Sequence, residues 1–317
     1  MNTDTDQSGE LDQLLRDVTE TARPAAHDGK VATYIPALAD VDPQKFSLAA
    51  IEMDGTEHAT GDADEHFPIQ SISKVFALVL AMQKADQGDG VADELWRRVG
   101  REPSGDPYNS LVQLEREQGV PRNPMINAGS LIVDDVLLDH CDDARASMHE
   151  LISELAGEEI DVDEEVLRSE RDTASRNRAM ANLMASFGNL THDVDEVLDL
   201  YVDQCAISMT SRQLARAVRF LANDGVDPAS GHRVLSSALT RRVAAIMLTC
   251  GTYDAAGEFA FQVGLPCKSG VAGAIVSLVP RQMGVCVWSP PLEPSGNSLA
   301  GRVALTELSR RLDLTIF

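Results

Sequence analysis

The stretch that decides the fold reads Phe67-Pro68-Ile69-Gln70-Ser71-Ile72-Ser73-Lys74-Val75-Phe76. Its polar Gln-Ser pair leads into an apolar run that continues to Met82, and the run predicts a helix with Ser71 in its first turn. Residues three apart on a helix share a face, so the Ser71 hydroxyl and the Lys74 amine can touch. A lysine whose pKa is lowered by burial or by a nearby cation can take a proton from a serine. The pair is therefore a candidate nucleophile and base for acyl transfer.

The start of this helix has a second chemical use and a simpler alternative. Free backbone N–H groups at a helix start can stabilise a developing oxyanion. The alternative is a serine that caps the helix, followed by a solvated lysine. The four-residue pattern alone favours the alternative, so the rest of the chain has to decide.

Composition limits the classes of partner. The chain has 317 residues, of which 44% are hydrophobic, enough for one large or two closely packed domains. Its net charge of -23 comes from 50 acidic and 27 basic residues. Such a charge repels nucleic acid and anionic membranes, so neither is an expected partner. Carboxylate-rich, lysine-poor surfaces stay hydrated in concentrated salt, and we hypothesise an acidic surface suited to a high-salt cytoplasm.

Cysteine and histidine spacing gives no metal or disulfide pattern. The five cysteines are odd in number and lack Cys-x-x-Cys spacing, and the histidines lack paired spacing. We therefore expect a reducing compartment, no metal and no cofactor. The first residues lack a basic and apolar leader, and no apolar run approaches the ~18 residues of a membrane helix. These features predict a cytoplasmic protein.

The order of the predicted elements defines a fold class. Residues 11–23 have helical spacing, and residues 46–61 form a predicted hairpin around Asp54-Gly55. Helical periods then dominate residues 95–99, 109–118, 128–140, 144–155, 176–187, 194–205, 211–223 and 235–248. Short strands are predicted at 259–263, 273–279 and 283–288, before a last helix at 298–312.

This order predicts an α+β protein with one antiparallel sheet, flanked by helices and assembled from both chain ends. An all-helical domain is inserted between the two sheet segments. We place the sheet domain at residues 1–68 and 230–317 and the helical domain at 69–229. Ser71 then lies at the junction of the two domains, where we expect the active site.

A second motif lies at the far end of the helical insertion and reads Lys268-Ser269-Gly270-Val271-Ala272-Gly273. An early Ser-x-x-Lys with a late Lys-Ser-Gly resembles the serine β-lactamase and penicillin-binding protein superfamily, and implies a β-lactamase/transpeptidase-like fold. The chain resembles the serine-dependent glutaminase family more narrowly. The matching segments are Tyr34-Ile35-Pro36, Gln70 to Lys74, Glu102-Pro103-Ser104-Gly105, Asn123 to Gly129, Ser169-Glu170-Arg171, Arg176-Asn177, Cys250 to Asp254, Gly264 to Gly273 and Trp288 to Leu292.

The resemblance implies an enzyme that hydrolyses the side-chain amide of L-glutamine to L-glutamate and ammonia through a glutamyl-serine intermediate. It implies Ser71 as nucleophile, Lys74 as its general base and Tyr253 as the proton relay to ammonia. The oxyanion hole would be the backbone N–H groups of Ser71 and Val271. Lys268, with Ser269 and Gly270, would form a supporting wall. The residues implied to hold the substrate are Asn127, Glu170, Asn177 and Tyr201, with Tyr34 and Gln70 lining the pocket.

The charges of a zwitterionic amino acid fit these side chains. Glu170 can pair with the α-ammonium group, while the amides of Asn127 and Asn177 and the hydroxyl of Tyr201 can hold the α-carboxylate without an arginine. The ammonium groups of Lys268 and of protonated Lys74 can lower the pKa of a nearby tyrosine. The resemblance also implies a homodimer or homotetramer.

The chain departs from the family where Ala174-Ser175 replaces a usual Gly-Asp. The resulting Ser175-Arg176-Asn177 mimics the Ser-x-Asn motif of β-lactamases. Two rival functions follow from the sequence: a β-lactamase or peptidase-like acyl enzyme, and a catalytically silent binding module. The missing leader opposes the first, and the intact set of Ser71, Lys74, Tyr253 and Lys268 opposes the second.

Overall fold

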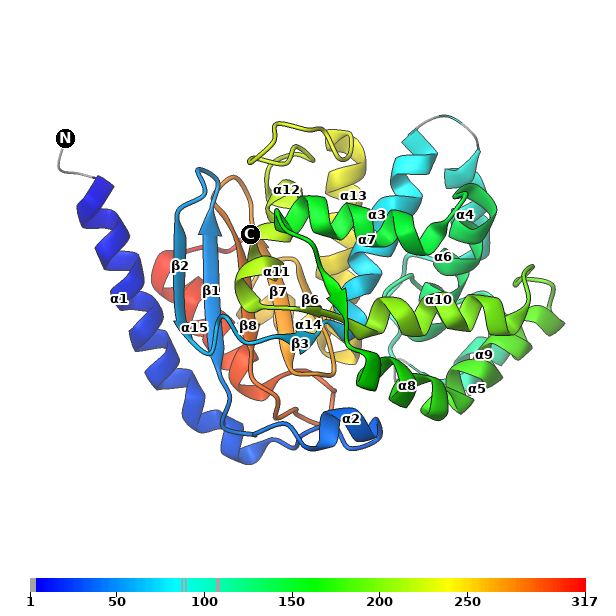
Figure 1. Cartoon of the computed structure of the whole chain (residues 1–317), viewed down its shortest axis with the longest axis horizontal. Helices are drawn as coiled ribbons and strands as arrows, with labels where there is room; N and C mark the ends of the chain where they lie inside the picture. Colours follow the sequence, from blue (N-terminus) through cyan, green and yellow to red (C-terminus); the bar gives the residue numbers. More distant parts are fainter. Residues whose placement is uncertain (1–3, 87, 89, 107–108) are drawn as a thin grey trace.

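A five-stranded antiparallel sheet forms the centre of the computed structural model, which describes residues 4–86, 88, 90–106 and 109–317. The strand order is β2-β1-β8-β7-β6 (Figure 1). The strands are β1 (Ser47–Glu52), β2 (Glu57–Gly61), β6 (Cys267–Ser269), β7 (Ala274–Val279) and β8 (Met283–Trp288). Strands from the two ends of the chain therefore share one sheet, which confirms the predicted α+β class.

The two sheet segments join along β1 and β8. Their antiparallel register pairs Ser47 with Trp288 and Glu52 with Met283. Every residue of β7 and β8 is buried, because helices cover both faces of the sheet. Burial on both faces explains why these strands are continuous apolar runs rather than alternating ones.

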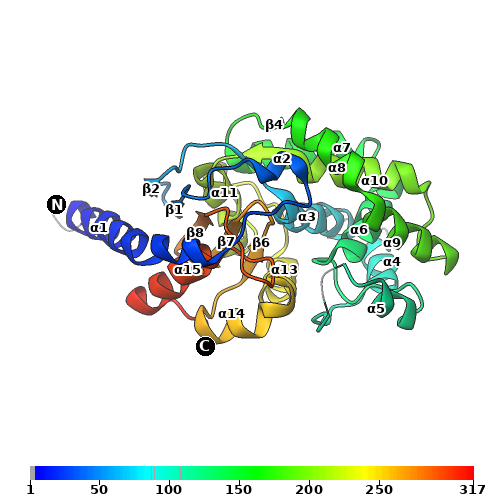
Figure 2. The same ribbon diagram turned by 90° about the horizontal axis from the view of Figure 1, so that it is seen from below.

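Two helices from opposite chain ends pack together on one face of the sheet (Figure 2). Leu15 of the first and Leu305 of the last belong to one buried apolar cluster with Leu48 and Val285 of the sheet. Phe259 belongs to the same cluster. The helical segments on this side are α1 (Asp4–Ala22), η1 (Arg23–Asp28), α14 (Ala256–Gln262) and α15 (Leu299–Leu312).

The opposite face carries the helical part of the molecule. Helices α11 (Ser211–Ala217) and α12 (Arg219–Ala222) pack directly on the sheet. The remaining helices are α2 (Pro36–Ala39), α3 (Ser73–Asp86), α4 (Val91–Arg98), α5 (Leu111–Arg116), α6 (Asn127–His140), α7 (Ala144–Ala156), α8 (Glu164–Thr173), α9 (Ser175–Ser186), α10 (Val194–Ala206) and α13 (Ser237–Cys250). The division at residues 68/69 and 229/230 stays a prediction.

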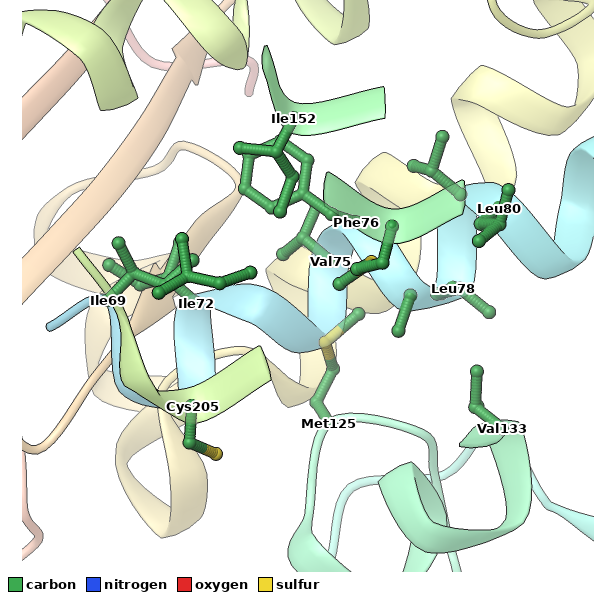
Figure 3. Close-up of a cluster of buried hydrophobic side chains, with 14 of the residues drawn as sticks. Ile69, Ile72, Val75, Phe76, Leu78, Leu80, Met125, Val133, Ile152 and Cys205 are labelled. Atoms are coloured by element: carbon green, nitrogen blue, oxygen red, sulfur yellow. The ribbon is translucent and has the colours of Figure 1, made fainter. Parts of the chain in front are cut away.

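Helix α3 runs through the middle of this helical part. Its residues from Ser73 to Met82 are buried all round, which matches the uninterrupted apolar sequence. Figure 3 shows Phe76 of α3 beside Ile152 of α7, with Met125 and Val133 on another side of the helix. A helix enclosed in this way gives the Ser71–Lys74 segment a rigid support.

One predicted strand is wrong. Residues 259–263 lie in α14 and its end, and the strand is instead β6, which contains Lys268 and Ser269. The aromatic alternation of Phe259 and Phe261 imitates a strand, but Phe259 is 1% exposed while Phe261 is 87% exposed. Burial returns at Val263, four residues after Phe259, which is the helical period. The second motif therefore begins inside a strand rather than between two strands.

Three features were not predicted from the sequence. They are helix α2, helix α8 and a small sheet of β3 (Phe67–Pro68), β5 (Ile207–Met209) and β4 (Asp161–Val162) in the order β3-β5-β4. Strands of two or three residues are too short for a periodic signal. In the described part of the chain, no helix is long and apolar enough to cross a membrane.

Candidate active site

Ser71 lies in a single 3-10 turn, η2 (Gln70–Ile72), and α3 begins only at Ser73. This corrects the prediction that Ser71 opens the α-helix itself. The preceding residue, Gln70, has a φ of 51°, a value that is uncommon for any residue but glycine. A backbone bond of 2.8 Å from the Ile69 N–H to the Ile207 carbonyl fixes the chain before the turn. Strained backbone of this kind is concentrated at functional sites.

The predicted Ser71–Lys74 contact is present. Lys74 Nζ donates a 2.7 Å hydrogen bond to Ser71 Oγ and a 3.2 Å bond to the hydroxyl of Tyr201. The lysine is fully enclosed, and burial lowers its pKa, although electrostatic interactions with Cys205, Asp134 and Glu170 partly oppose that shift. A lowered pKa favours the neutral amine, which is the form that can accept a proton from a serine hydroxyl.

The facing wall comes from β6 and the turn before α14. Lys268 is fully buried, and its Nζ donates a 2.5 Å bond to the Ser269 carbonyl and lies 4.7 Å from the ring centre of Tyr253. Burial, and next the charge of Lys74, set the pKa of Lys268 well below its usual range. Tyr253 has a φ of 60° and donates a 3.1 Å bond to the same Ser269 carbonyl. The two residues thus converge on one backbone oxygen.

Glycine brings this wall against the turn that holds Ser71. A Cβ added at Gly270 would lie 2.7 Å from the Ile69 carbonyl oxygen, so only glycine lets the two backbones approach this closely. Ser269 Oγ donates a 2.5 Å bond to Asn297, whose amide donates to the Thr252 carbonyl at 3.1 Å. Asn297 ties β6 to the residue before Tyr253, and the sequence analysis did not identify it.

A cavity of about 100 Å³ lies over Ser71. The residues lining it are Tyr34, Ile35, Gln70, Ser71, Asn109, Asn127, Glu170, Thr173, Arg176, Asn177, Tyr201 and Val271. All predicted pocket residues except Tyr253 are in this set. Lys74 lies behind Ser71, while Lys268 and Tyr253 support the sheet side without lining the cavity.

Glu170 reaches the cavity from the unpredicted helix α8. Asp163 caps this helix by accepting from the N–H groups of Glu165 and Val166 at 2.9 and 3.0 Å. Val166 and Glu170 are four residues apart on the buried face, and Glu170 is only 6% exposed. Burial raises the pKa of Glu170, while a hydrogen bond with Gln70 and the charge of Lys74 oppose this effect. The capping Asp163 and the apolar pair at 166–167 were the sequence signals that could have revealed α8.

The two predicted asparagines meet across the cavity. Asn127 is the first residue of α6, and its Nδ2 donates a 3.0 Å bond to Oδ1 of Asn177 on α9. The turn before α6 is set by Asn123, whose side chain accepts from Met125 N–H at 3.0 Å. A Cβ at Gly129 would lie 1.8 Å from the Asn123 carbonyl oxygen, so glycine permits this tight entry.

Arg176 is the main addition to the predicted set. It lines the cavity, and its Nε donates a 3.0 Å bond to the Asn109 carbonyl. Arg176 is therefore a further candidate for holding a carboxylate in the cavity, and the carboxylate site without an arginine stays a prediction. Tyr34, at the cavity mouth, is 54% exposed. Among the described residues, no cluster of three or more His, Cys, Asp or Glu side chains is arranged to hold a metal ion.

An antiparallel sheet assembled from both chain ends, with a Ser-x-x-Lys pair at its junction with helices, defines a serine acyl-transfer protein of the β-lactamase-like fold. The Glutaminase family model matches residues 29–317. A glutaminase of Mesorhizobium japonicum is 50% identical over 315 residues, or 98% of each chain. The chain therefore belongs to the glutaminase family.

Solved structures agree with this assignment. A probable glutaminase of Bacillus subtilis matches with a TM-score of 0.88 and 33% identity, covering 97% of this chain and 98% of that chain. A second Bacillus subtilis structure is a covalent complex with 5-oxo-L-norleucine, formed by reaction with 6-diazo-5-oxo-L-norleucine. It matches with a TM-score of 0.83 and 33% identity, covering 95% of this chain and 98% of that chain.

Proposed function

We propose that this protein hydrolyses the side-chain amide of L-glutamine to L-glutamate and ammonia through a glutamyl ester on Ser71. The observation that carries the proposal is the 2.7 Å bond from buried Lys74 Nζ to Ser71 Oγ beneath a small polar cavity. Relatives named glutaminase and the covalent Bacillus subtilis complex support the same chemistry. No cofactor takes part in this scheme.

The first step is attack on the amide carbonyl. Neutral Lys74 takes the Ser71 proton as the serine oxygen bonds to the carbonyl carbon. The backbone N–H groups of Ser71 and Val271 hold the oxyanion, since both residues line the cavity. Each such donor contributes about 3 to 4 kcal/mol to the transition state in related acyl-transfer enzymes.

The second step expels ammonia and the third hydrolyses the ester. Tyr253 relays to the departing nitrogen the proton that Lys74 took from Ser71, and the Lys268 amine lies 4.7 Å from the centre of its ring. Lys74, neutral again once its proton has been relayed, takes a proton from the water that attacks the glutamyl ester and gives it to Ser71 Oγ as the ester bond breaks. Ser269 and Gly270 support this wall by their backbone contacts.

Substrate choice follows from the charges around the cavity. Glu170 forms an ion pair with the α-ammonium group of glutamine. Hydrogen bonds from Asn127, Asn177 and the Tyr201 hydroxyl hold the α-carboxylate. Arg176 adds a guanidinium on the Asn177 side of the cavity and strengthens carboxylate binding. Gln70 and Tyr34 complete the pocket walls.

We further propose a cytoplasmic homodimer or homotetramer with an acidic surface. All five cysteines are free thiols, as expected in a reducing compartment. The net charge of -23 supports the acidic surface. The sheet domain (1–68 and 230–317) and the helical domain (69–229) would meet at Ser71.

A coupled glutamate assay with L-glutamine tests the main proposal, with Ser71→Ala as the comparison. Wild-type protein should release glutamate and ammonia in equal amounts, while the variant should lose about 10⁴-fold or more of the rate. Treatment with 6-diazo-5-oxo-L-norleucine should add mass to wild type at Ser71 and leave the variant unmodified. A wild type that releases no glutamate at any salt concentration would refute the proposal, and nitrocefin turnover would favour the β-lactamase alternative.

A further inference from the structure

A second buried carboxyl interacts electrostatically with Lys74, and the proposed mechanism does not use it. Asp134 of α6 is 0% exposed. Its two oxygens accept from Gln204 Nε2 of α10 at 2.9 and 3.2 Å, and the same amide lies 3.3 Å from Ser130 Oγ. In the described part of the chain, no ion pair reaches Asp134 within 4.0 Å. A buried carboxyl without an ion pair is costly, and an apolar residue of similar size would pack there at lower cost.

Asp134 connects the two helices that hold the catalytic lysine and the substrate. Gln204 is three residues after Tyr201, so both side chains lie on one side of α10. Asp134 is seven residues after Asn127, two turns along the same side of α6. The Asp134–Gln204 bonds therefore fix the helix of Asn127 to the helix whose Tyr201 contacts Lys74 Nζ.

We infer that Asp134 is a positioning residue for the Ser71–Lys74 pair, acting through Gln204 on the helix of Tyr201 and through its charge on Lys74. The inference rests on the proposed function of Lys74 as the base. When Lys74 takes the serine proton, a positive charge appears in a fully buried place. A carboxylate nearby stabilises that charge.

Among the groups that interact with Lys74, Asp134 is the carboxyl without another assigned role that can stabilise the charged lysine. The charged or titratable groups that act on Lys74 or are acted on by it are Asp134 of α6, Glu170 of α8, Cys205 of α10 and Lys268 of β6, with the Tyr201 hydroxyl in direct contact. Glu170 is assigned to the substrate ammonium. Burial raises the pKa of the Cys205 thiol to about 12, so this group is uncharged at neutral pH. Lys268 cannot supply a negative charge, and the charge of Lys74 lowers the pKa of Lys268.

The coupling between Asp134 and Lys74 is reciprocal. Burial raises the pKa of Asp134 well above its usual range, while the charge of Lys74 and the bond from Gln204 lower it, and Asp135 raises it further. The charge of Asp134 in turn raises the pKa of Lys74. Each group therefore favours the charged form of the other, which suits a base that must start neutral and become charged during the reaction.

The neighbouring residue provides a matched control. Asp135 is also 0% exposed, but it pairs with Arg98 and accepts from the backbone N–H groups of Thr191 and His192 at 3.0 and 2.8 Å. Burial acts to raise the pKa of Asp135, but these bonds outweigh it and the pKa is lowered. Asp135 thus has a complete structural explanation on another side of α6, whereas Asp134 does not.

The test measures the titration of Lys74 directly. The chain has only five lysines, so protein labelled with ¹³C-lysine gives few side-chain signals, and Lys74→Met identifies the one to follow. Asp134→Asn should lower the Lys74 midpoint by about 0.5 to 1 pH unit, because asparagine cannot ionise when Lys74 becomes charged. It should also lower kcat about three- to tenfold and change KM less than twofold, since the base is weakened and the cavity is intact. Asp135→Asn should leave the midpoint unchanged or raise it, although it also destabilises the fold.

Three results would overturn the inference. The first is a Lys74 midpoint in Asp134→Asn equal to that of wild type, and the second is an equal drop of this midpoint in Asp135→Asn. The third is a change in the KM of Asp134→Asn without a change in its kcat. If Asp134→Asn does not fold, Gln204→Met serves instead. This variant removes the amide donor, favours the protonated carboxyl and should shift the Lys74 midpoint down by a smaller amount, and no shift would overturn the inference. Failure of the proposed function is separate, because it would appear as absent glutamine turnover in wild type whatever the lysine titration shows.

Discussion

The two walls of the cavity are built in different ways. The helical wall, formed by η2 with α6, α8, α9 and α10, contributes side chains: Glu170, Asn127 and Arg176 all line the cavity. The sheet wall, residues 251–255 and 267–273, contributes only Val271 to the lining; its close backbone approach at Gly270 sets the position of this wall, and Tyr253 acts from outside the lining. We therefore expect the effect of a substitution on the helical wall to depend on the chemistry of the side chain. On the sheet wall we expect the effect of a substitution to depend on whether it adds atoms where two backbone segments lie close together.

The largest effect is expected at Lys74, where the two walls meet. Lys74→Met keeps the length of the side chain but removes the base, so kcat/KM for glutamine should fall about 10²- to 10⁴-fold. Rate measurements with circular dichroism as a folding control test this. Retention of more than a tenth of the activity would show that another group takes the Ser71 proton.

The sheet wall should respond to a single methyl group. In Gly270→Ala the new Cβ would lie 2.7 Å from the Ile69 carbonyl oxygen, so the wall must move away from Ser71. We expect a kcat loss of about 10- to 100-fold, as for other small misplacements of catalytic groups. The matched control is Gly257→Ala in α14, where nothing lies within 4 Å of the added Cβ. The control should keep full activity and gain about 0.5 to 1 kcal/mol of stability. Equal activities in the two variants would contradict the difference between the walls.

A substitution at Arg176 tests whether the side chains of the helical wall bind the substrate. Arg176→Ala should raise KM about five- to twentyfold with little change in kcat, because it removes a charge-assisted contact to the substrate carboxylate. Arg178→Ala is the control, since Arg178 pairs with Asp195 and does not line the cavity. An unchanged KM in Arg176→Ala would mean that the substrate carboxylate binds without an arginine, as predicted from the sequence.

The smallest effect concerns pH. Burial lowers the pKa of Lys74, so the neutral base is present at lower pH than for an exposed lysine, and kcat/KM should be lost as pH falls through that lowered pKa. The Tyr201 hydroxyl accepts a bond from Lys74 Nζ and thereby favours its charged form. Tyr201→Phe should move the acidic limb of the pH profile down by about 0.3 unit with a two- to fivefold loss of rate. An upward shift of the limb would contradict this assignment of the hydrogen bond.

Local patterns explain which parts of the fold were predictable. The hairpin of β1 and β2, the buried run of α3 and the contact between Ser71 and Lys74 all depend on residues close in sequence. Helix α8 was missed because acidic residues surround its short apolar pair, and α14 was mistaken for a strand because of its aromatic alternation.

The site was predictable only as far as motifs extend. The family motifs identified eight of the twelve residues that line the cavity, and their catalytic and binding roles stay predictions. Arg176, Asn297 and Asp134 act through tertiary contacts with distant residues, such as the bond from Ser269 to Asn297 across 28 positions. No local period encodes such contacts.

The small number of lysines, five in the whole chain, also has a consequence for chemical labelling. Lys74 and Lys268 are fully enclosed, so of the five lysine amines an acylating reagent in water can reach those of Lys30, Lys45 and Lys84 in the folded chain. Reductive methylation or attachment to an amine-reactive resin should therefore leave the reacting atoms untouched. Isotope-tagged acyl groups detected on Lys74 or Lys268 by mass spectrometry would then report the fraction of molecules in which the structure around these lysines had unfolded.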